Sequence, residues 1–363
     1  AGLDELDIII ELIGGSEGIA KDLVEQAILN GKSVITANKA LIANHGAEIS
    51  RLVATKNVAF GYEAAVAGGI PIIKTVREGL AGNRIDRIYG ILNGTCNYIL
   101  SVMRETGRAF DDVLLEAQKL GYAEADPAFD VDGVDAAHKL SILSAIAFQT
   151  PLNFSAVHIE GIRFISPIDI EFANELGYRI KLLAISERSS KGVQQRVRPC
   201  LVSLPTLIAQ VEGVFNAVAA EAEGCGTSLS YGRGAGAGPT TSAVLADLID
   251  IAAGKKYFMF GVDDDDLVET SNTHLEDLSG SYYLRLQVFD RPGVLADLTA
   301  IFRDEGVSVE ALLQRGRNPD GTTPVVLTTH ETNEAAIHRS IQKFKGLESV
   351  VEDPRILPIE VFE

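Results

Sequence analysis

Residues 121–139 combine a dense group of carboxylates with a lysine at the end. The apolar spacing of the second half of this segment predicts a helix, in which Asp135 and Lys139 stand four residues apart and therefore on one face. Asp-Pro and Asp-Gly pairs before the helix favour turns, which places Glu124 and Asp130 on a loop at its start. A lysine beside carboxylates suits proton delivery to a small polar substrate that carries an ammonium group. The plainer interpretation is a solvated acidic loop followed by a helical ion pair worth about 0.3–0.5 kcal/mol.

A second candidate is Lys39, which follows an apolar run of strand type. Open α/β sheets place ligands at the carboxyl ends of their strands, so Lys39 is in position to reach one. The alternative is an exposed lysine at the start of a helix.

The glycine-rich run at 234–238 looks like a phosphate-binding loop, but it lacks a preceding strand in a βαβ unit and a following acidic residue at ribose-binding distance. We interpret this run as a crossing between domains.

Two other reactive side chains near these motifs are predicted to take no part in chemistry. Cys96 is expected to be a small apolar helix residue. His138 projects about 100° away from Lys139 on the predicted helix, which argues against a role as the acid.

The composition is that of an ordinary globular protein of two or three domains, with 363 residues, 46% hydrophobic and 23% charged. The net charge of −18 argues against nucleic-acid and anionic-membrane partners, and no apolar run approaches the 18 residues of a spanning helix. The amino-terminal residues lack the pattern of a signal peptide, and the three cysteines fit neither a disulfide framework nor a zinc site. We therefore expect a cytoplasmic protein.

The elements that must position these residues begin with alternating strands and helices. Strands are predicted at 7–13, 33–37 and 57–63, and helices at 16–31, capped by Ser16, and at 40–55. This order is typical of a doubly wound, Rossmann-like α/β domain. Since such a sheet needs more strands, we expect part of this nucleotide-binding domain to lie outside the present sequence.

The remaining chain predicts two further folds. Residues 65–231 are expected to form an α+β substrate and dimerisation domain, with strands at 84–92, 159–165 and 197–201. A first helix is expected to end at residue 80, and further helices are expected at 96–106, 110–120, 134–148 and 168–184. Residues 232–256 are expected to return to the domain of residues 1–64 through a helix at 240–253, and 257–280 to form an acidic linker. Residues 281–361 show the order of a ferredoxin-like domain, with strands at 282–289, 307–315, 324–330 and 350–356 and helices after the turn at 290–293 and at 333–345. The predicted fold class is α/β overall.

Nearly the whole chain resembles homoserine dehydrogenase of the single-function type with a C-terminal ACT regulatory domain. Eight motifs carry the resemblance in sequence order: ELIGG at 11–15, TANKAL at 36–41, YEAAVAGGIP at 62–71, GILNGTCNY at 90–98, residues 121–139, ELGY at 175–178, EGVFNA at 212–217 and GAGAGP at 234–239. The resemblance implies reversible reduction of L-aspartate 4-semialdehyde to L-homoserine with NADPH or NADH, on the route to threonine, methionine and isoleucine. It replaces the plainer interpretation of residues 121–139.

By this resemblance Lys139 is the proton donor to the aldehyde oxygen, and Asp135 keeps Lys139 charged and helps to bind substrate. Glu124 is expected to hold the substrate ammonium group. The rest of the implied substrate pocket consists of Tyr122, Gly94, Thr95 and Asp130.

The resemblance also implies cofactor and cation sites. Lys39 is expected to reach the nicotinamide and the substrate, and the implied backbone contacts to the cofactor are Gly14, Gly121 and Gly238. A sodium ion is expected to bind the carboxylate of Glu63 and the carbonyls of Val66, Gly68 and Ile70, which are hard oxygen ligands. The alternative is a tight Gly-Gly turn, with the ion purely architectural or absent.

The last domain resembles an ACT domain through DRPGVL at 290–295. This resemblance implies an amino-acid effector, with threonine expected, and a homodimer or homotetramer; the alternative is a domain that only supports oligomerisation. The glycine-rich pyrophosphate turn of the family has no counterpart in residues 1–363, so we expect this polypeptide as written to bind dinucleotide poorly or not at all and its activity to be impaired. The alternative function is a non-catalytic amino-acid-binding protein built on the same scaffold.

Overall fold

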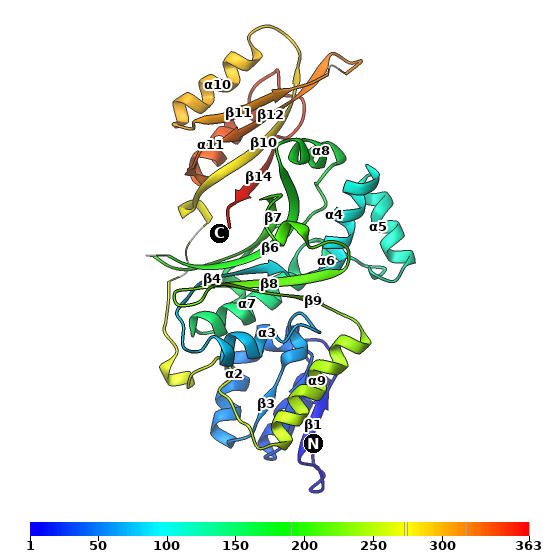
Figure 1. Ribbon diagram of the computed structural model, residues 1–363, viewed down its shortest axis with the longest axis vertical. Helices are drawn as coiled ribbons and strands as arrows, with labels where there is room; N and C mark the ends of the chain where they lie inside the picture. The colour runs from blue at the N-terminus through cyan, green and yellow to red at the C-terminus, as the bar shows by residue number, and fades with distance from the viewer. Residues whose placement is uncertain (190, 272, 274, 317, 363) are drawn as a thin grey trace. The chain divides into compact units, whose positions relative to one another are not determined.

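The computed structural model describes residues 1–189, 191–271, 273, 275–316 and 318–362 (Figure 1). The chain divides into two compact units: unit 1 comprises residues 1–164, 182–198 and 211–272, and unit 2 comprises residues 165–181, 199–210 and 273–363. Strands β6 (Tyr178–Ser189) and β7 (Gly192–Ser203) contribute residues to both units. Within the described ranges, no helix is long and apolar enough to cross a membrane.

Unit 1 begins with a three-stranded parallel sheet in the order β1 (Ile8–Glu11), β2 (Ser33–Thr36), β3 (Phe60–Gly61). Helices α1 (Ile19–Leu29) and α2 (Lys39–Lys56) connect these strands. Helix α9 (Ala237–Ala252) follows the glycine-rich run and packs Ala243 and Val244 against Ile35 of β2. This contact places α9 against the first sheet.

Two details of this region differ from the prediction. Strand β1 ends at residue 11, because the Glu11 carboxylate turns back and accepts the N–H groups of Ile13 and Gly14. The prediction that Ser16 caps α1 is wrong: the N-cap is Gly18, whose φ of 71° lies in the region that glycine adopts without strain. The helix therefore starts later than expected.

The second part of unit 1 is built on an antiparallel sheet. Strand β4 (Ile85–Ile91) pairs with β6 and with β8 (Phe215–Ala222), β8 pairs with β9 (Gly226–Arg233), and β5 (Val157–Ile159) pairs in parallel with β7. The helices of this part are α3 (Ile72–Lys74), continued by a π-helical turn η2 (Thr75–Gly79), α4 (Gly94–Thr106), α5 (Phe110–Lys119), α6 (Ala128–Val131) and α7 (Val134–Phe148). Every residue of α7 after its first is buried.

The predicted helix at 168–184 is wrong in its second half. Helix α8 (Pro167–Glu175) ends before Gly177, whose φ of 86° turns the chain into strand β6. Strands β8 and β9 were not expected, and the strand predicted at 159–165 ends at residue 159. The alanine-rich sequence of β8 has no strong strand preference, so its pairing with β4 decides its conformation.

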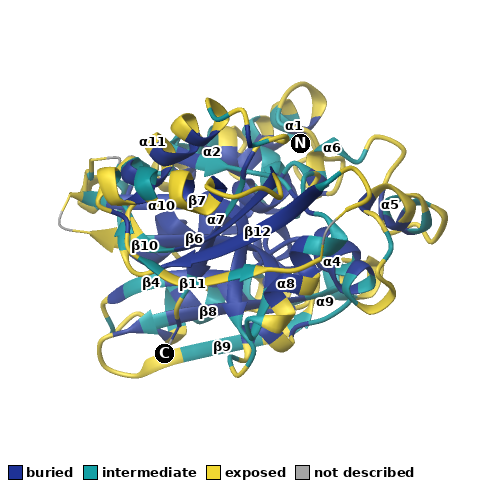
Figure 2. Cartoon of the chain, turned by 90° about the horizontal axis from the view of Figure 1, so that it is seen from above, coloured by how far each residue is buried: buried dark blue, intermediate teal, exposed yellow. Residues whose placement is uncertain are grey.

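Unit 2 contains α8 and the predicted ferredoxin-like fold. The strands are β10 (Ser279–Phe289), β11 (Val309–Gln314), β12 (Thr322–Thr329), the short β13 (Thr332–Asn333) and β14 (Arg355–Glu360), in the order β11-β12-β10-β14. Helices α10 (Val294–Glu305) and α11 (Glu334–Lys345) pack on alternate residues of β10, including Leu284 and Leu286. Strand β12 is buried along its whole length (Figure 2). The last strand lies about five residues later than predicted, at 355–360 rather than 350–356.

Candidate active site

The side chain of Asp135 lies between two lysines that come from different parts of unit 1. Lys139 Nζ is 2.7 Å from Asp135 Oδ2, and Lys39 Nζ is 3.2 Å from Asp135 Oδ1. Lys139 also donates a hydrogen bond of 2.7 Å to the carbonyl of Leu92. Asp135 and Lys139 are 4% and 8% exposed, so the pair is a buried one and not a solvated helical ion pair. The structure thus brings together the three residues predicted to be catalytic.

The local sequence explains how these side chains are held. Gly133 has a φ of 89° and precedes the first residue of α7, so the acidic loop can turn directly into the helix that carries Asp135 and Lys139. Lys39 is the first residue of α2, at the end of β2. Its neighbour Asn38 caps α2 by accepting the N–H of Leu41 and also donates to the carbonyl of Gly15.

The electrostatics of the cluster favour an ionised Asp135. Burial by itself would raise the pKa of this carboxyl group, but the charges of Lys139 and Lys39 outweigh burial and lower its pKa to about 2. Burial raises the pKa of Asp130 and lowers that of His138. Asp135 therefore stays negative at neutral pH, and the two ammonium groups beside it are held in place by that charge.

Asn93 is a member of this cluster that the sequence analysis did not identify. Its Nδ2 donates hydrogen bonds of 2.8 Å to Asp130 Oδ1 and to Asp135 Oδ2. Its Oδ1 accepts the N–H of Cys96 and so caps α4. An asparagine directly before a helix is a signal for a cap, but no local pattern showed that the same amide would bridge two acids. Asn93 joins the acidic loop to the start of α4.

The other predicted substrate residues lie around the acidic loop. Thr95 Oγ1 donates a hydrogen bond of 2.6 Å to the carbonyl of Tyr122, which joins the loop to α4. Gly94 lies so close to the carbonyl of Val214 that a Cβ atom would meet it at 2.8 Å. Glu124 is exposed, between α5 and α6.

A small cavity of about 210 Å³ lies at the carboxyl ends of β1 and β2. Its lining is Leu12, Gly14, Ala37, Asn38 and Thr240. Gly14 has a φ of 85° and open space where a Cβ atom would be, and the N-terminus of α9 has no side-chain cap. Open space beside backbone N–H groups at a helix start fits an anionic dinucleotide. Gly238 lies in the first turn of α9, whereas Gly121 is exposed on the loop after α5.

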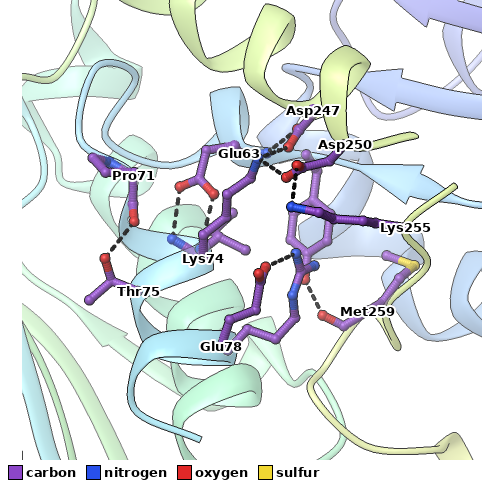
Figure 3. Close-up of polar contacts among 12 residues, drawn as sticks. Glu63, Pro71, Lys74, Thr75, Glu78, Asp247, Asp250, Lys255 and Met259 are labelled. Atoms are coloured by element: carbon purple, nitrogen blue, oxygen red, sulfur yellow. Dashed lines mark hydrogen bonds and ion pairs between the residues drawn. The ribbon is translucent and has the colours of Figure 1, made fainter. Parts of the chain in front are cut away.

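The predicted cation ligand Glu63 lies in a separate buried cluster (Figure 3). Its two carboxylate oxygens accept the N–H groups of Ile73, at 2.9 Å, and Lys74, at 3.0 Å, at the start of the α3–η2 helix. Its own N–H donates to Asp247 of α9. Burial raises the pKa of Glu63 to about 7, although its bonds to Ile73 and Lys74 act in the opposite direction. In the described residues no group of three or more histidine, cysteine, aspartate or glutamate side chains could hold a metal ion.

Comparison with known proteins agrees with this geometry. Three family profiles match the chain: homoserine dehydrogenase, NAD binding domain, at residues 2–63; homoserine dehydrogenase at 71–249; and ACT domain at 282–348. A homoserine dehydrogenase of Neisseria gonorrhoeae is 48% identical, over 98% of this chain and 83% of the relative. One of Pseudomonas aeruginosa is 47% identical, over 95% of this chain and 81% of the relative. The chain belongs to the homoserine dehydrogenase family.

Solved structures support the family assignment. The crystal structure of a homoserine dehydrogenase from Thiobacillus denitrificans matches with a TM-score of 0.93 and 48% identity, over 98% of this chain and 82% of that chain. A hyperthermophilic archaeal homoserine dehydrogenase in complex with NADPH matches with a TM-score of 0.60 and 30% identity, over 69% of this chain and 73% of that chain. The chain is thus an oxidoreductase with an NAD(P)-binding domain and an ACT domain, and the alternative of a non-catalytic amino-acid-binding protein is not favoured.

Proposed function

We propose that this chain catalyses the reversible reduction of L-aspartate 4-semialdehyde to L-homoserine with NADPH or NADH, a step in threonine, methionine and isoleucine biosynthesis in the cytoplasm. The observation that carries the proposal is the buried placement of Asp135 between Lys139 and Lys39. An aldehyde that accepts hydride becomes an alkoxide, and a positioned ammonium group both stabilises that charge and supplies the proton.

Lys139 is suited to be the proton donor. An ammonium group has three N–H donors, and Lys139 uses two of them, on Asp135 and on the carbonyl of Leu92. The third is available for the aldehyde oxygen. A nicotinamide cofactor, when bound, would supply the hydride. Lys139 Nζ would give its proton to the aldehyde oxygen and would then be reprotonated. Asp135 orients the ammonium group, and Lys39 adds a second positive charge.

The acidic loop is proposed to recognise the amino-acid part of the substrate. Glu124 would hold the substrate ammonium group, and Asp130, which accepts a hydrogen bond from Asn93, would support it. The hydrogen bond between Thr95 and the carbonyl of Tyr122 ties this loop to α4, which supports a pocket that also includes Gly94. Because Glu124 is exposed, the loop would have to close over the substrate before this contact forms.

The dinucleotide is proposed to bind along the carboxyl ends of β1 and β2. Gly14, at the cavity, and Gly238, at the start of α9, would let the dinucleotide come close to the backbone. Lys39 of α2 lies beside Asp135, the side chain that also pairs with Lys139. Gly121, on the acidic loop, is proposed to contact the dinucleotide through its backbone. The NADPH bound in the archaeal relative supports a cofactor of this class, and titration of NADPH and NADH would establish the preference.

A sodium ion is proposed to bind Glu63 and the carbonyls of Val66, Gly68 and Ile70. Each carboxylate oxygen of Glu63 accepts one backbone N–H, which leaves further lone pairs for a hard cation. Thermal melting in sodium chloride and in choline chloride of equal ionic strength tests this site. A melting temperature that does not depend on sodium would favour the alternative of a tight turn without an ion.

The regulatory proposal is feedback by threonine at the ACT domain in a homodimer or homotetramer. A pocket of about 340 Å³, called the loop pocket below, adjoins the DRPGVL turn and is lined by residues 288–296, Gln314 and Val325. The alternative is an ACT domain that only supports oligomerisation. Inhibition by threonine in the assay, with sedimentation to establish the oligomer, separates these possibilities.

Steady-state oxidation of homoserine tests the catalytic proposal. The Lys139→Ala variant should lose kcat by roughly 10²–10⁴-fold, because general acid catalysis is removed. Lys119→Ala, at an exposed lysine of α5, is the matched control and should keep full activity. Equal kcat in the two variants, with both folded by circular dichroism, would remove Lys139 from the mechanism.

A further inference from the structure

The open face of the ACT-domain sheet in unit 2 carries a second pocket, which shares the lining residue Phe289 with the loop pocket. Along β10, Leu284, Leu286 and Val288 point into the core beneath α10 and α11. Side chains alternate along a strand, so Arg285 and Gln287 point to the opposite face. There they line a cavity of about 570 Å³, whose full lining is Ser166, Ile168, Arg285, Gln287, Phe289, Asn318, Asp320, Thr322, Val351 and Glu352. We call it the polar cavity.

The guanidinium group of Arg285 is held rigidly at one wall of the polar cavity. Its Nε and Nη2 donate to the carboxylate of Asp169 at 2.6 and 3.3 Å, and Asp169 also accepts the hydroxyl of Tyr283. Asp169 is itself fixed by a capping box with Ser166 at the start of α8. Among the described residues, the remaining nitrogen, Nη1, has one distant ion pair of 3.9 Å, with Glu352. Arg285 is 7% exposed, so its Nη1 is a buried donor that could bind an anionic group of a ligand.

The opposite wall carries acceptors. Thr322 Oγ1 donates to Asp320 and accepts from the amides of Gln287 and Asn318. This arrangement occupies both amide nitrogens and leaves the amide oxygens without hydrogen bonds in the described part of the chain. The backbone N–H and the hydroxyl of Thr322 lower the pKa of Asp320, so it is ionised at neutral pH. Two amide oxygens and an ionised carboxylate suit an ammonium group.

The charges of the polar cavity favour a ligand with excess positive charge. Asp169 neutralises Arg285, and among the residues that the structure describes no lysine or further arginine lines the cavity beside Asp320 and Glu352. A neutral zwitterion would satisfy Arg285 and one acid and leave the other acid unpaired. A ligand with one carboxylate and two ammonium groups would pair with all of these groups.

We propose that the polar cavity binds a free α-amino acid with a cationic side chain, with its carboxylate on Arg285 and its ammonium groups on Asp320 and Glu352. This site lies across the sheet from the helices and differs in position and charge from the loop pocket. Its occupant would stabilise the contact between α8 and β10, because the Arg285 that binds its carboxylate also pairs with Asp169 of α8.

Isothermal titration calorimetry on the full chain, with L-lysine as the probe, tests this proposal without any catalytic readout. We expect saturable binding at one site per chain. L-Norleucine lacks the terminal ammonium group and cadaverine lacks the carboxylate, so each should bind at least tenfold more weakly. Absence of L-lysine binding at millimolar concentration, or equal binding of L-norleucine, would overturn the proposal.

Variants locate the site. Glu352→Gln changes an exposed side chain of the cavity and should weaken L-lysine binding at least fivefold, and Asp320→Asn should do the same. Glu348→Gln is the matched control, since this exposed acid lies outside the cavity lining, and it should bind L-lysine as the parent chain does. Asp290→Asn, in the loop pocket, should also leave binding unchanged. Loss of binding in Asp290→Asn but not in Glu352→Gln would place the ligand at the loop pocket and refute the assignment.

Discussion

Two buried carboxylates of unit 1 have opposite electrostatic behaviour. Asp135 and Glu63 are 4% and 2% exposed, so burial opposes ionisation in both. Asp135 has two ammonium groups within 3.2 Å and a pKa of about 2. Glu63 has two backbone N–H groups, a carboxylate of Asp247 nearby and a pKa of about 7. The charges of the neighbours, more than the depth of burial, decide whether a buried acid is ionised.

The consequence is a difference in role. A carboxylate that stays ionised can hold lysines at a fixed place for proton transfer, as proposed for Asp135. A carboxyl group that titrates near neutrality contributes to the junction between α9 and the α3–η2 helix in a way that depends on pH (Figure 3). Lys74, which pairs with Asp247 at 3.2 Å and with Asp250 at 2.6 Å, is engaged by other acids.

Among the variants that test this comparison, the largest effect is expected from Asp135→Asn. This change keeps the shape but leaves Lys139 and Lys39 without their shared anion, so kcat should fall by roughly 10²-fold or more. The free energy of unfolding should fall by about 3–5 kcal/mol, because a buried charge loses its partner. Kinetics and urea denaturation measure the two effects, with Asp112→Asn, at an exposed acid of α5, as control. An unchanged kcat would contradict the role of Asp135.

A pH series should separate Glu63 from Asp135. The pKa of Glu63 rises on folding from 4.5 to about 7, so its contribution to stability is fully present below pH 4.5 and is lost as pH rises through about 7. The pKa of Asp135 falls from 3.8 to about 2, so its contribution is present above pH 3.8 and is lost as pH falls through about 2.

Glu63→Gln tests the first of these windows. In sodium-free buffer, where no bound cation holds Glu63 ionised, the parent chain should lose stability relative to the variant by an amount on the order of 1–3 kcal/mol as pH rises from 4.5 to 7. Chemical denaturation at several pH values measures this difference. A difference that stays constant across the window would show that Glu63 titrates as an ordinary acid, and the contrast with Asp135 would then fail.

The smallest effect is expected from Asn93→Ala. The variant loses a helix cap and the bridge between Asp130 and Asp135, at a cost of about 1–2 kcal/mol in unfolding free energy. The two acids then face each other without the amide, so KM for homoserine should rise more than kcat falls. Asn93→Asp keeps the cap acceptor but adds negative charge, and it should be more harmful than Asn93→Ala to KM. The reverse order would limit Asn93 to its capping role.

Part of the active site could be predicted from local spacing. Asp135 and Lys139 are one helical turn apart, and helix geometry alone puts them on one face. The position of Lys39 at the end of a strand was also a local signal. The contact between Lys39 and Asp135 could not be predicted from local signals, because their positions differ by 96 in the sequence. Only the packing of α2 near α7 brings them together.

The less predictable parts depend on long-range partners. The helix expected at 168–184 becomes α8 and β6, because Gly177 breaks the helix and β4 provides an antiparallel partner. Strand β8 forms from an alanine-rich run by pairing with β4 and β9. The double use of Asn93 depends on the position of the acidic loop over α4.

The sequence by itself determined the alternating strands and helices of residues 1–64, the turn before α7 and the shared face of one acid and one lysine, since these follow from patterns within a few residues. Only the tertiary structure decided the charge state of each buried acid. Asp135 and Glu63 are both buried carboxylates beside helix starts, but α2 brings a second ammonium group to Asp135 beside that of Lys139, whereas burial dominates at Glu63. In a buried site with little water to screen them, the charges that the fold brings close decide whether the effect of burial on the pKa is overcome.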